Sequence, residues 1–367
     1  MKKLIPAKVI ISALLLFLIS FSCKESDDEV NTDPTNMVLN VTVEDSTTGK
    51  IIITASAVNA IEYQLYIDLA SEPTSTNSTG NFEYSLGGPG NYRVEVRAYG
   101  VSGRYVKAER NISIDQGDPV TIEDGYISPE SYPDYELVWS DEFNGTGVNP
   151  EYWSFEIGTG YGGWGNNESQ YYRKENASVS DGTLIIEARK ETFQSSNYTS
   201  ARIVTRNKKS FQYGRIDIRA LLPVGQGMWP ALWMLGNTFQ TAGWPACGEI
   251  DIMEMIGGKG RENTVHGVLH WDNNGHVQAG GSYTLPSGIY ANEYHVFSLI
   301  WDETNIRWLV NNVQYNVINI TPSHMTEYHQ PGFFIFNLAV GGNWPGYPDA
   351  TTVFPQQFKV DYIRVFQ

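Results

Sequence analysis

The chain has 367 residues, enough for two or three domains, and its formal net charge at pH 7 is −16. This acidic balance argues against nucleic acids and other polyanions as partners, because like charges repel. Hydrophobic residues make up 41% of the chain, an ordinary share for a globular protein. Short alternating runs are frequent and long helical periodicities are rare, so the sequence predicts an all-β fold.

The N-terminus has the features of a targeting segment. Three lysines precede an apolar run over residues 9–21, which is shorter than the roughly 20 residues of a membrane span. Cys23 follows this run, in an arrangement that resembles a bacterial lipoprotein signal, and the acidic stretch after it resembles the surface-export tag of Bacteroidetes lipoproteins. We expect a signal peptide at 1–22, a lipid on Cys23 and a surface-exposed outer-membrane lipoprotein that meets the membrane only through that lipid. A secreted protein with an ordinary signal peptide is the alternative.

Cys23 and Cys247 are the two cysteines of the chain. If Cys23 carries lipid, Cys247 has no disulfide partner, and the stability of the fold comes from core burial. Cys247 precedes Glu249 by two residues. It is expected to be a small buried residue, with a place at the edge of a site as the alternative.

A small β-module is predicted after a polar tether over residues 23–36. Strand-like runs recur through residues 37–115 with Gly, Asn, Ser and Pro between them, as in an antiparallel sandwich of about 80 residues. The run GNYRVEVRA at 90–98 resembles a strand of immunoglobulin-like or polycystic-kidney-disease (PKD) modules. The module is expected to be a spacer, and carbohydrate binding is the alternative.

Residues 116–134 are rich in Gly and Pro and are predicted to form a second linker. All ten tryptophans lie beyond it, so residues 135–367 are expected to hold an aromatic functional site. Trp301 and Trp308 have the pattern of hairpin core residues. Other tryptophans, beside glycines and prolines, are expected to face solvent and to suit the CH-rich faces of sugar rings.

The segment GEIDIMEM at 248–255 places three carboxylates in an apolar strand. Alternation puts Glu249 and Asp251 on one face but Glu254 among the isoleucines, where a charge is costly. A β-bulge at Met253 returns Glu254 to the acidic face.

Two carboxyl groups on one face suit the hydrolysis of a glycosidic bond. One attacks the sugar, while the other protonates the leaving oxygen and then activates water. A third acid raises the pKa of a neighbour or shares its proton. A calcium loop or a solvated strand face is the alternative, although a calcium loop favours Gly and Asn over Ile and Met between its acids.

Seven segments in order resemble glycoside hydrolase family 16, in the bulged form typical of laminarinases, agarases and carrageenases. They are LVWSDEFNG (137–145), WGNNESQYY (164–172), GMWPALWMLG (227–236), GWPACGEIDIMEMIG (243–257), VHGVLHW (265–271), FNLAVGGNWPG (336–346) and VDYIRVFQ (360–367). The resemblance implies a β-jelly-roll sandwich with an open cleft and hydrolysis of β-glycans with retention, without a catalytic cofactor.

The resemblance also implies residue roles. Glu249 would be the nucleophile, Glu254 the acid/base, and Asp251 the group that tunes the nucleophile. The expected sugar-binding residues are Asn166, Arg202, Trp229, Trp233, Trp244, His270, Asn337 and Trp344. A structural Ca²⁺ is expected on the backbone carbonyls of Glu142 and Gly182 and the side chain of Asp361.

Substrate preference follows from two features. Trp244 directly before Pro245 resembles the β-1,3-glucan group, and the acidic balance disfavours sulfated galactans. We therefore expect a monomeric endo-β-1,3-glucanase of laminarinase type that acts on β-glucan. Agarase or porphyranase activity is one alternative and a non-catalytic glucan-binding lipoprotein is another; transglycosylation with the same two glutamates stays open.

Overall fold

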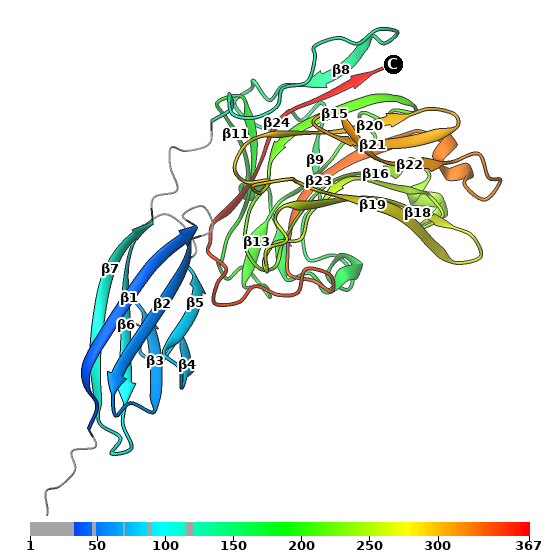
Figure 1. Cartoon of the computed structure of the whole chain (residues 1–367). Coiled ribbons are helices and arrows are strands. Elements are labelled where there is room, and N and C mark those ends of the chain that lie inside the picture. Colours follow the sequence, from blue (N-terminus) through cyan, green and yellow to red (C-terminus); the bar gives the residue numbers. More distant parts are fainter. Residues whose placement is uncertain (1–32, 46–48, 69, 87–89, 115–120) are drawn as a thin grey trace, which may run out of the picture.

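The structure is a computed structural model that describes residues 33–45, 49–68, 70–86, 90–114 and 121–367 (Figure 1). The predicted signal peptide, Cys23 and most of the predicted tether lie outside the described residues. Strands dominate the rest, which confirms the all-β prediction. In the described part of the chain, no helix has the length and apolar content that a membrane crossing requires.

The N-terminal module consists of two small antiparallel sheets that share one apolar core. Alternation produces this core: every second residue of strand β2 turns inward, so Ile51 and Ile53 are buried. One sheet has the order β1 (Thr35–Asp45), β2 (Lys50–Val58), β5 (Asn81–Ser85). The other has the order β4 (Ser75–Asn77), β3 (Glu62–Ile67), β6 (Gly90–Tyr99), β7 (Tyr105–Ile114). The sequence did not predict the short β4, and the likeness to immunoglobulin-like or PKD modules stays a prediction.

The C-terminal part contains two large antiparallel sheets, drawn in green to red in Figure 1. The first, of eight strands, has the order β11 (Ala177–Ser180), β12 (Thr183–Ala188), β24 (Gln356–Phe366), β15 (Gly214–Leu221), β20 (His295–Trp301), β21 (Asn305–Val310), β22 (Val313–Asn319), and β8 (Leu137–Asp141) pairs with β24. The second, of seven strands, has the order β19 (His276–Thr284), β18 (Thr264–Asp272), β17 (Glu249–Glu254), β16 (Met228–Gly236), β23 (Gly332–Val340), β14 (Arg202–Val204), β9 (Ser154–Phe155).

A continuous apolar core lies between these two sheets. Strands of both contribute inward side chains, and Trp301 and Trp308 are almost fully buried in it, as predicted. The short elements outside the sheets are β10 (Gln170–Tyr172), which pairs in parallel with β13 (Tyr198–Ser200), the one-turn helix α1 (Phe239–Ala242), and the turns Gly163–Asn167, Lys174–Asn176 and Thr326–His329. The core thus holds the seven-stranded sheet rigidly from one side and leaves its other face free for a site.

The second predicted linker is described from residue 121 onward, and this part is bonded to the eight-stranded sheet. Arg219 on β15 is 1% exposed, and its guanidinium donates to three backbone carbonyls, at 2.6, 2.8 and 2.7 Å. These carbonyls belong to Ile122, Asp124 and Tyr126. A buried guanidinium needs such acceptors, so residues 121–126 are held against the eight-stranded sheet.

Candidate active site

The strand β17 contains a bulge, one residue before the position predicted at Met253. Against β16, Met253 pairs with Leu232 while Asp251 pairs with Trp233, so Ile252 is an extra residue. Both Ile252 and Met253 are buried in the core between the sheets. Two consecutive apolar side chains therefore point inward, and Glu254 returns to the face of Glu249 and Asp251.

The opposite sheet supports the bulge from below. The indole Nε1 of Trp308 on β21 donates to the backbone carbonyl of Asp251 at 2.8 Å, where the register shifts. Gly267 on β18 makes room for this indole, since a Cβ there would lie 2.3 Å from Trp308 Cδ1. The bulge is thus satisfied by a core residue that approaches only because position 267 has no side chain.

Cross-strand pairing arranges the cleft residues in rows across the seven-stranded sheet. Each row takes one residue from each of several neighbouring strands, in matching register. One row contains Arg202, Asn337, Ala231, Glu254 and His266. A parallel row contains Leu235, Glu249, His270 and Gln278, and a row between them contains Asp251. The small Ala231 leaves space beside Glu254.

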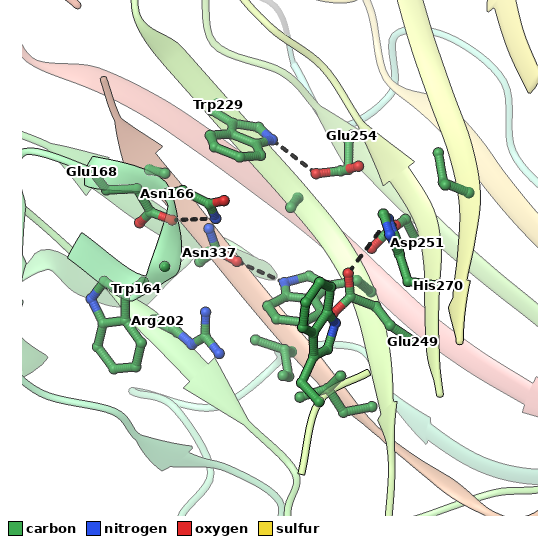
Figure 2. A pocket seen from close by; sticks show the side chains of 18 of the residues that line it. Trp164, Asn166, Glu168, Arg202, Trp229, Glu249, Asp251, Glu254, His270 and Asn337 are labelled. Carbon is green, nitrogen blue, oxygen red and sulfur yellow. Dashed lines mark hydrogen bonds and ion pairs between the residues drawn. The ribbon is translucent and has the colours of Figure 1, made fainter. Parts of the chain in front are cut away.

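These rows form the floor of a cleft of about 840 Å³ (Figure 2). All three predicted catalytic residues and all eight predicted sugar-binding residues line it. Side chains alternate along β18: His266, Val268 and His270 face the cleft, and the residues between them are buried.

Glu254 is the last of the three acids along β17. Its Oε1 accepts a hydrogen bond of 2.9 Å from the indole of Trp229 on β16. Burial, assisted by the nearby Asp251 carboxylate, raises the pKa of Glu254 to about 8. The exposed Trp344 packs edge-on against Trp229 with ring centroids 5.5 Å apart, so two indoles flank this carboxyl group. Glu254 therefore keeps its proton at neutral pH.

Glu249 and Asp251 form a coupled pair at the other end. Asp251 is 3% exposed, and burial raises its pKa to about 8. Burial and Asp251 together raise the pKa of Glu249 well above its ordinary value. The indole of Trp244 donates to Glu249 Oε2 at 3.1 Å, a contact that favours the ionised form of Glu249. The pair therefore holds a proton more tightly than isolated carboxyls, and the hydrogen bond to Glu249 directs that proton toward Asp251.

His270 on β18 faces this pair. Its Nε2 lies 3.1 Å from Asp251 Oδ2 and 3.7 Å from Glu249 Oε1 (Figure 2). Asp251 Oδ2 nevertheless has no hydrogen-bond partner, so the close approach to His270 lacks the alignment of a hydrogen bond. On the other side of the ring, His270 Nδ1 and His276 Nε2 share a hydrogen bond of 2.8 Å.

The wall opposite His270 contains Arg202, whose guanidinium lies between two indoles. Its Cζ is 4.6 Å from the ring centre of Trp164 and 4.8 Å from that of Trp233. Its Nε donates to Glu156 at 2.6 Å, and the Trp233 indole donates to Asn337 at 2.7 Å. These contacts fix the orientation of Arg202, Trp233 and Asn337 toward the cleft.

Sequence reasoning missed Glu168 and two of its partners, Gln170 and Tyr172. Glu168 lines the cleft, accepts hydrogen bonds from Asn166, Gln170 and Tyr172 at 3.2, 2.7 and 3.1 Å, and has a pKa raised by burial. Tyr172 in turn accepts a hydrogen bond of 3.1 Å from Asn337. The segment WGNNESQYY at 164–172 could have indicated Glu168, because it contains a single acid among amides and tyrosines. His276 was also missed, because its position follows from the β18–β19 pairing.

Cys247 is a structural residue. It is buried with Val204, Leu235, Phe333 and Ile335 in a small apolar cluster, and burial raises the pKa of its thiol to about 11. This confirms the interpretation as a small buried residue.

The expected calcium ligands lie in or next to strands of the eight-stranded sheet. Strands β8 and β12 both pair with β24, so Glu142, after β8, and Gly182, in the β11–β12 turn, lie toward the part of β24 that contains Asp361. Asp361 Oδ2 accepts a bond of 2.6 Å from Arg219, which leaves its other oxygen for a cation. The carboxylate of Glu142 pairs with Arg364 at 2.8 Å, in accord with a role for its carbonyl alone. The oxygen set fits Ca²⁺, and the ion itself stays a prediction.

Paired buried carboxyls beneath exposed indoles, in a cleft on a two-sheet β-sandwich, define a carbohydrate-cleaving hydrolase. Residues 165–364 match the sequence family described as glycosyl hydrolases family 16. The chain belongs to this family.

Known relatives cover the same part of the chain. A beta-glucanase of Rhodothermus marinus is 44% identical over 257 residues, which span 64% of this chain and 86% of the relative. A glucan endo-1,3-beta-glucosidase A1 of Niallia circulans is 37% identical over 284 residues, 69% of this chain and 41% of the relative. The crystal structure of the laminarinase catalytic domain from Thermotoga maritima superposes with a TM-score of 0.59 at 45% identity, and the match covers 64% of this chain and 98% of that domain. The jelly-roll architecture predicted for the catalytic part is thereby confirmed.

Proposed function

We propose that the chain is a retaining endo-β-1,3-glucanase that cleaves laminarin-like glucans through Glu249 and Glu254. The observation that carries this proposal is the bulge of β17, which sets Glu249, Asp251 and Glu254 on one cleft face. Two carboxyls in that arrangement supply the nucleophile and the acid/base of a double displacement.

The two glutamates have different environments, and these assign their roles. Glu254, with a pKa of about 8, is protonated at neutral pH and donates that proton to the glycosidic oxygen as the bond to C1 breaks. Glu249 attacks C1 and forms the glycosyl-enzyme. In the second step Glu254 takes a proton from water, the water oxygen bonds to C1, and Glu249 leaves as a carboxylate.

Asp251 makes the nucleophile available in this scheme. Because Glu249 and Asp251 share a tightly held proton, Glu249 is ionised when Asp251 carries it. Asp251 is the more deeply buried of the two, and the Trp244 indole stabilises the charge on Glu249. As Glu249 forms its bond to the sugar, its negative charge disappears, so Glu254 can ionise in the same step without a second carboxylate charge close by.

The cleft favours a neutral glucan as substrate. Trp244 and Trp344 are 47% and 39% exposed and lie near Glu249 and Glu254 respectively, so an indole is available for a sugar ring on each side of the acids. Aromatic faces bind the CH-rich faces of pyranose rings, and sites on both sides suit cleavage inside a chain. The names of the relatives, which include endo-1,3-beta-glucosidase and laminarinase, support the β-1,3 linkage.

A product profile tests this proposal. The protein is incubated with laminarin, mixed-linkage glucan, agarose and carrageenan, beside a Glu249→Ala control that should still bind glucan. Short β-1,3-oligosaccharides from laminarin, absent in the control, are the expected result. Cleavage of a galactan instead would overturn the substrate, and substantial activity of Glu249→Ala would overturn the site. Product analysis at high oligosaccharide concentration separates hydrolysis from transglycosylation.

The anchorage of the protein is a separate proposal. The apolar run before Cys23 and the acidic residues after it support a lipid on Cys23 and display at the outer surface of the cell. Replacement of Cys23 by Ser should move the protein from the membrane fraction to the soluble fraction. Unchanged fractionation of the Cys23→Ser variant would contradict lipid anchoring.

A further inference from the structure

The acidic end of the cleft contains three metal-ligand atoms that face one another. Glu249, Asp251 and His270 each offer one atom, and these atoms all lie within 4.8 Å of one another. The separations from His270 Nε2 are 3.1 Å to Asp251 Oδ2 and 3.7 Å to Glu249 Oε1. In a tetrahedral zinc site with Zn–N and Zn–O distances of about 2.0–2.1 Å, ligand atoms are about 3.3 Å apart. The two observed separations lie on either side of that value.

An unpartnered buried oxygen points into the same space. Asp251 is 3% exposed and its Oδ2 has no hydrogen-bond donor. A buried carboxyl oxygen without a partner is costly, and a bound cation that displaces the proton shared by Glu249 and Asp251 would remove that cost. Glu249 contributes Oε1, because its other oxygen already accepts the Trp244 indole.

The second ring nitrogen of His270 is already held. Its Nδ1 lies 2.8 Å from His276 Nε2, and the two rings stack with centroids 5.1 Å apart. When His276 accepts the Nδ1 proton, His270 Nε2 presents a lone pair to the carboxylates. Metal-binding histidines usually have such an outer partner, which fixes the ring and its tautomer.

We propose that Glu249, Asp251 and His270 form a binding site for Zn²⁺ or a similar first-row transition-metal dication, which blocks glycan cleavage when it is bound. A nitrogen and two oxygens with a fourth position open to the cleft suit Zn²⁺, whereas Ca²⁺ and Mg²⁺ require six or more oxygen ligands. The ion occupies the nucleophile and the place of the sugar, so metal and glycan exclude each other. The site is independent of which glycan the enzyme cleaves.

Calorimetric titration of the metal-free protein with ZnCl₂ tests the site. We expect one Zn²⁺ per chain at this site, and any binding of CaCl₂ or MgCl₂ elsewhere in the chain should be the same in the natural protein and in the ligand variants. His270→Gln and Asp251→Asn should each weaken binding by about tenfold or more, and His276→Phe, which keeps a stacked ring but removes the acceptor, by about 10- to 100-fold. His324→Gln is the matched control, since it removes an exposed histidine outside the cleft.

Two further measurements distinguish loss of the metal site from loss of the fold and test competition with the glycan. Melting curves of each variant show whether it is folded, and a loss common to His270→Gln and Asp251→Asn but absent from His324→Gln assigns the ligands. In Glu254→Gln, which retains all three ligands but cannot turn over, laminari-oligosaccharide should weaken Zn²⁺ binding. Absence of Zn²⁺ binding, or binding that survives both ligand variants, overturns the proposal. If Zn²⁺ binds as expected but an oligosaccharide that binds the Zn²⁺-free Glu254→Gln variant has no effect, the mutual exclusion is wrong. An oligosaccharide that does not bind that variant contradicts the proposed substrate instead.

Discussion

Glu254 has a raised pKa because it is buried next to another acid, and this determines how the rate should depend on pH. As the pH rises through about 8, Glu254 loses its proton and the leaving oxygen loses its acid. We expect kcat/KM to fall above that pH. A profile of kcat/KM that stays flat to pH 10 would contradict the role of Glu254 as the acid.

The same carboxyl group links pH to stability. Its pKa in the folded protein is above its ordinary value of 4.5, so the folded state binds more protons than the unfolded state between those two values. Stability due to Glu254 is therefore fully present below pH 4.5 and declines as the pH rises to about 8. Glu254→Gln should melt at a higher temperature than the natural protein at pH 9, and the two should differ little at pH 4. This is the balance expected at an active site, where a group needed for chemistry weakens the fold.

At the residue scale, the sequence predicted the acids and the sugar-binding residues better than their supports. The acids Glu249, Asp251 and Glu254 could be predicted, because three charges in an apolar strand require an explanation. The role of Tyr172 could not be predicted, since its hydrogen bond joins Asn337, 165 positions away in the chain. Contacts of that kind depend on the folded sheet, and no local pattern contains them.

The bulge of β17 is the element on which the site depends. Deletion of both Ile252 and Met253 would place Glu254 directly after Asp251, where strict alternation turns it toward the apolar core. Hydrolysis should then fall by the roughly 10²- to 10⁴-fold that a general acid contributes, or further. Initial rates on laminarin measure this loss, and retained activity would refute the argument.

A matched variant separates register from packing. Met253→Leu keeps the residue count and nearly the volume, so its cost should stay below about 1.5 kcal/mol and its activity should remain near that of the natural protein. If Met253→Leu were as inactive as the deletion, core packing and not register would be responsible.

At the element scale, alternation alone was enough to predict the bulge, because the cost of a buried charge excludes the regular strand. The support beneath it was not predictable. Trp308 belongs to the other sheet, and its hydrogen bond to Asp251 spans 57 positions. The short strand β4 was missed for a related reason: its three residues, Ser75–Asn77, are too few to show a period.

For the whole molecule, the buried Arg219 makes residues 121–126 part of the C-terminal sandwich. A chain that begins at residue 135 should be less stable than one that begins at 121, by at least about 3 kcal/mol, since three hydrogen bonds to a charged group are lost. Urea unfolding of the two truncated chains compares them directly. Equal midpoints with equal slopes would show that the segment only rests on the surface.

The all-β class was predictable because strands with turn residues between them are a local signal. The two-sheet catalytic part and its approximate extent were implied by the resemblance to the family. The order of strands within each sheet was not, since neighbours such as β16 and β23 lie about a hundred positions apart in the sequence. The N-terminal boundary of the C-terminal sandwich near residue 121 could not be predicted either, because glycines and prolines are typical both of free linkers and of segments bound along a sheet.

The row that contains Arg202, Asn337, Ala231, Glu254 and His266 has a consequence for refolding. Its five members come from five strands. They line up only when the pairs β14–β23, β23–β16, β16–β17 and β17–β18 have all formed. Loop closure over such distances is slow, so these pairings form late. Catalytic activity is therefore a reporter of the finished sheet: a collapsed chain with native-like strand content but an incomplete ladder contains the acids and yet has no site.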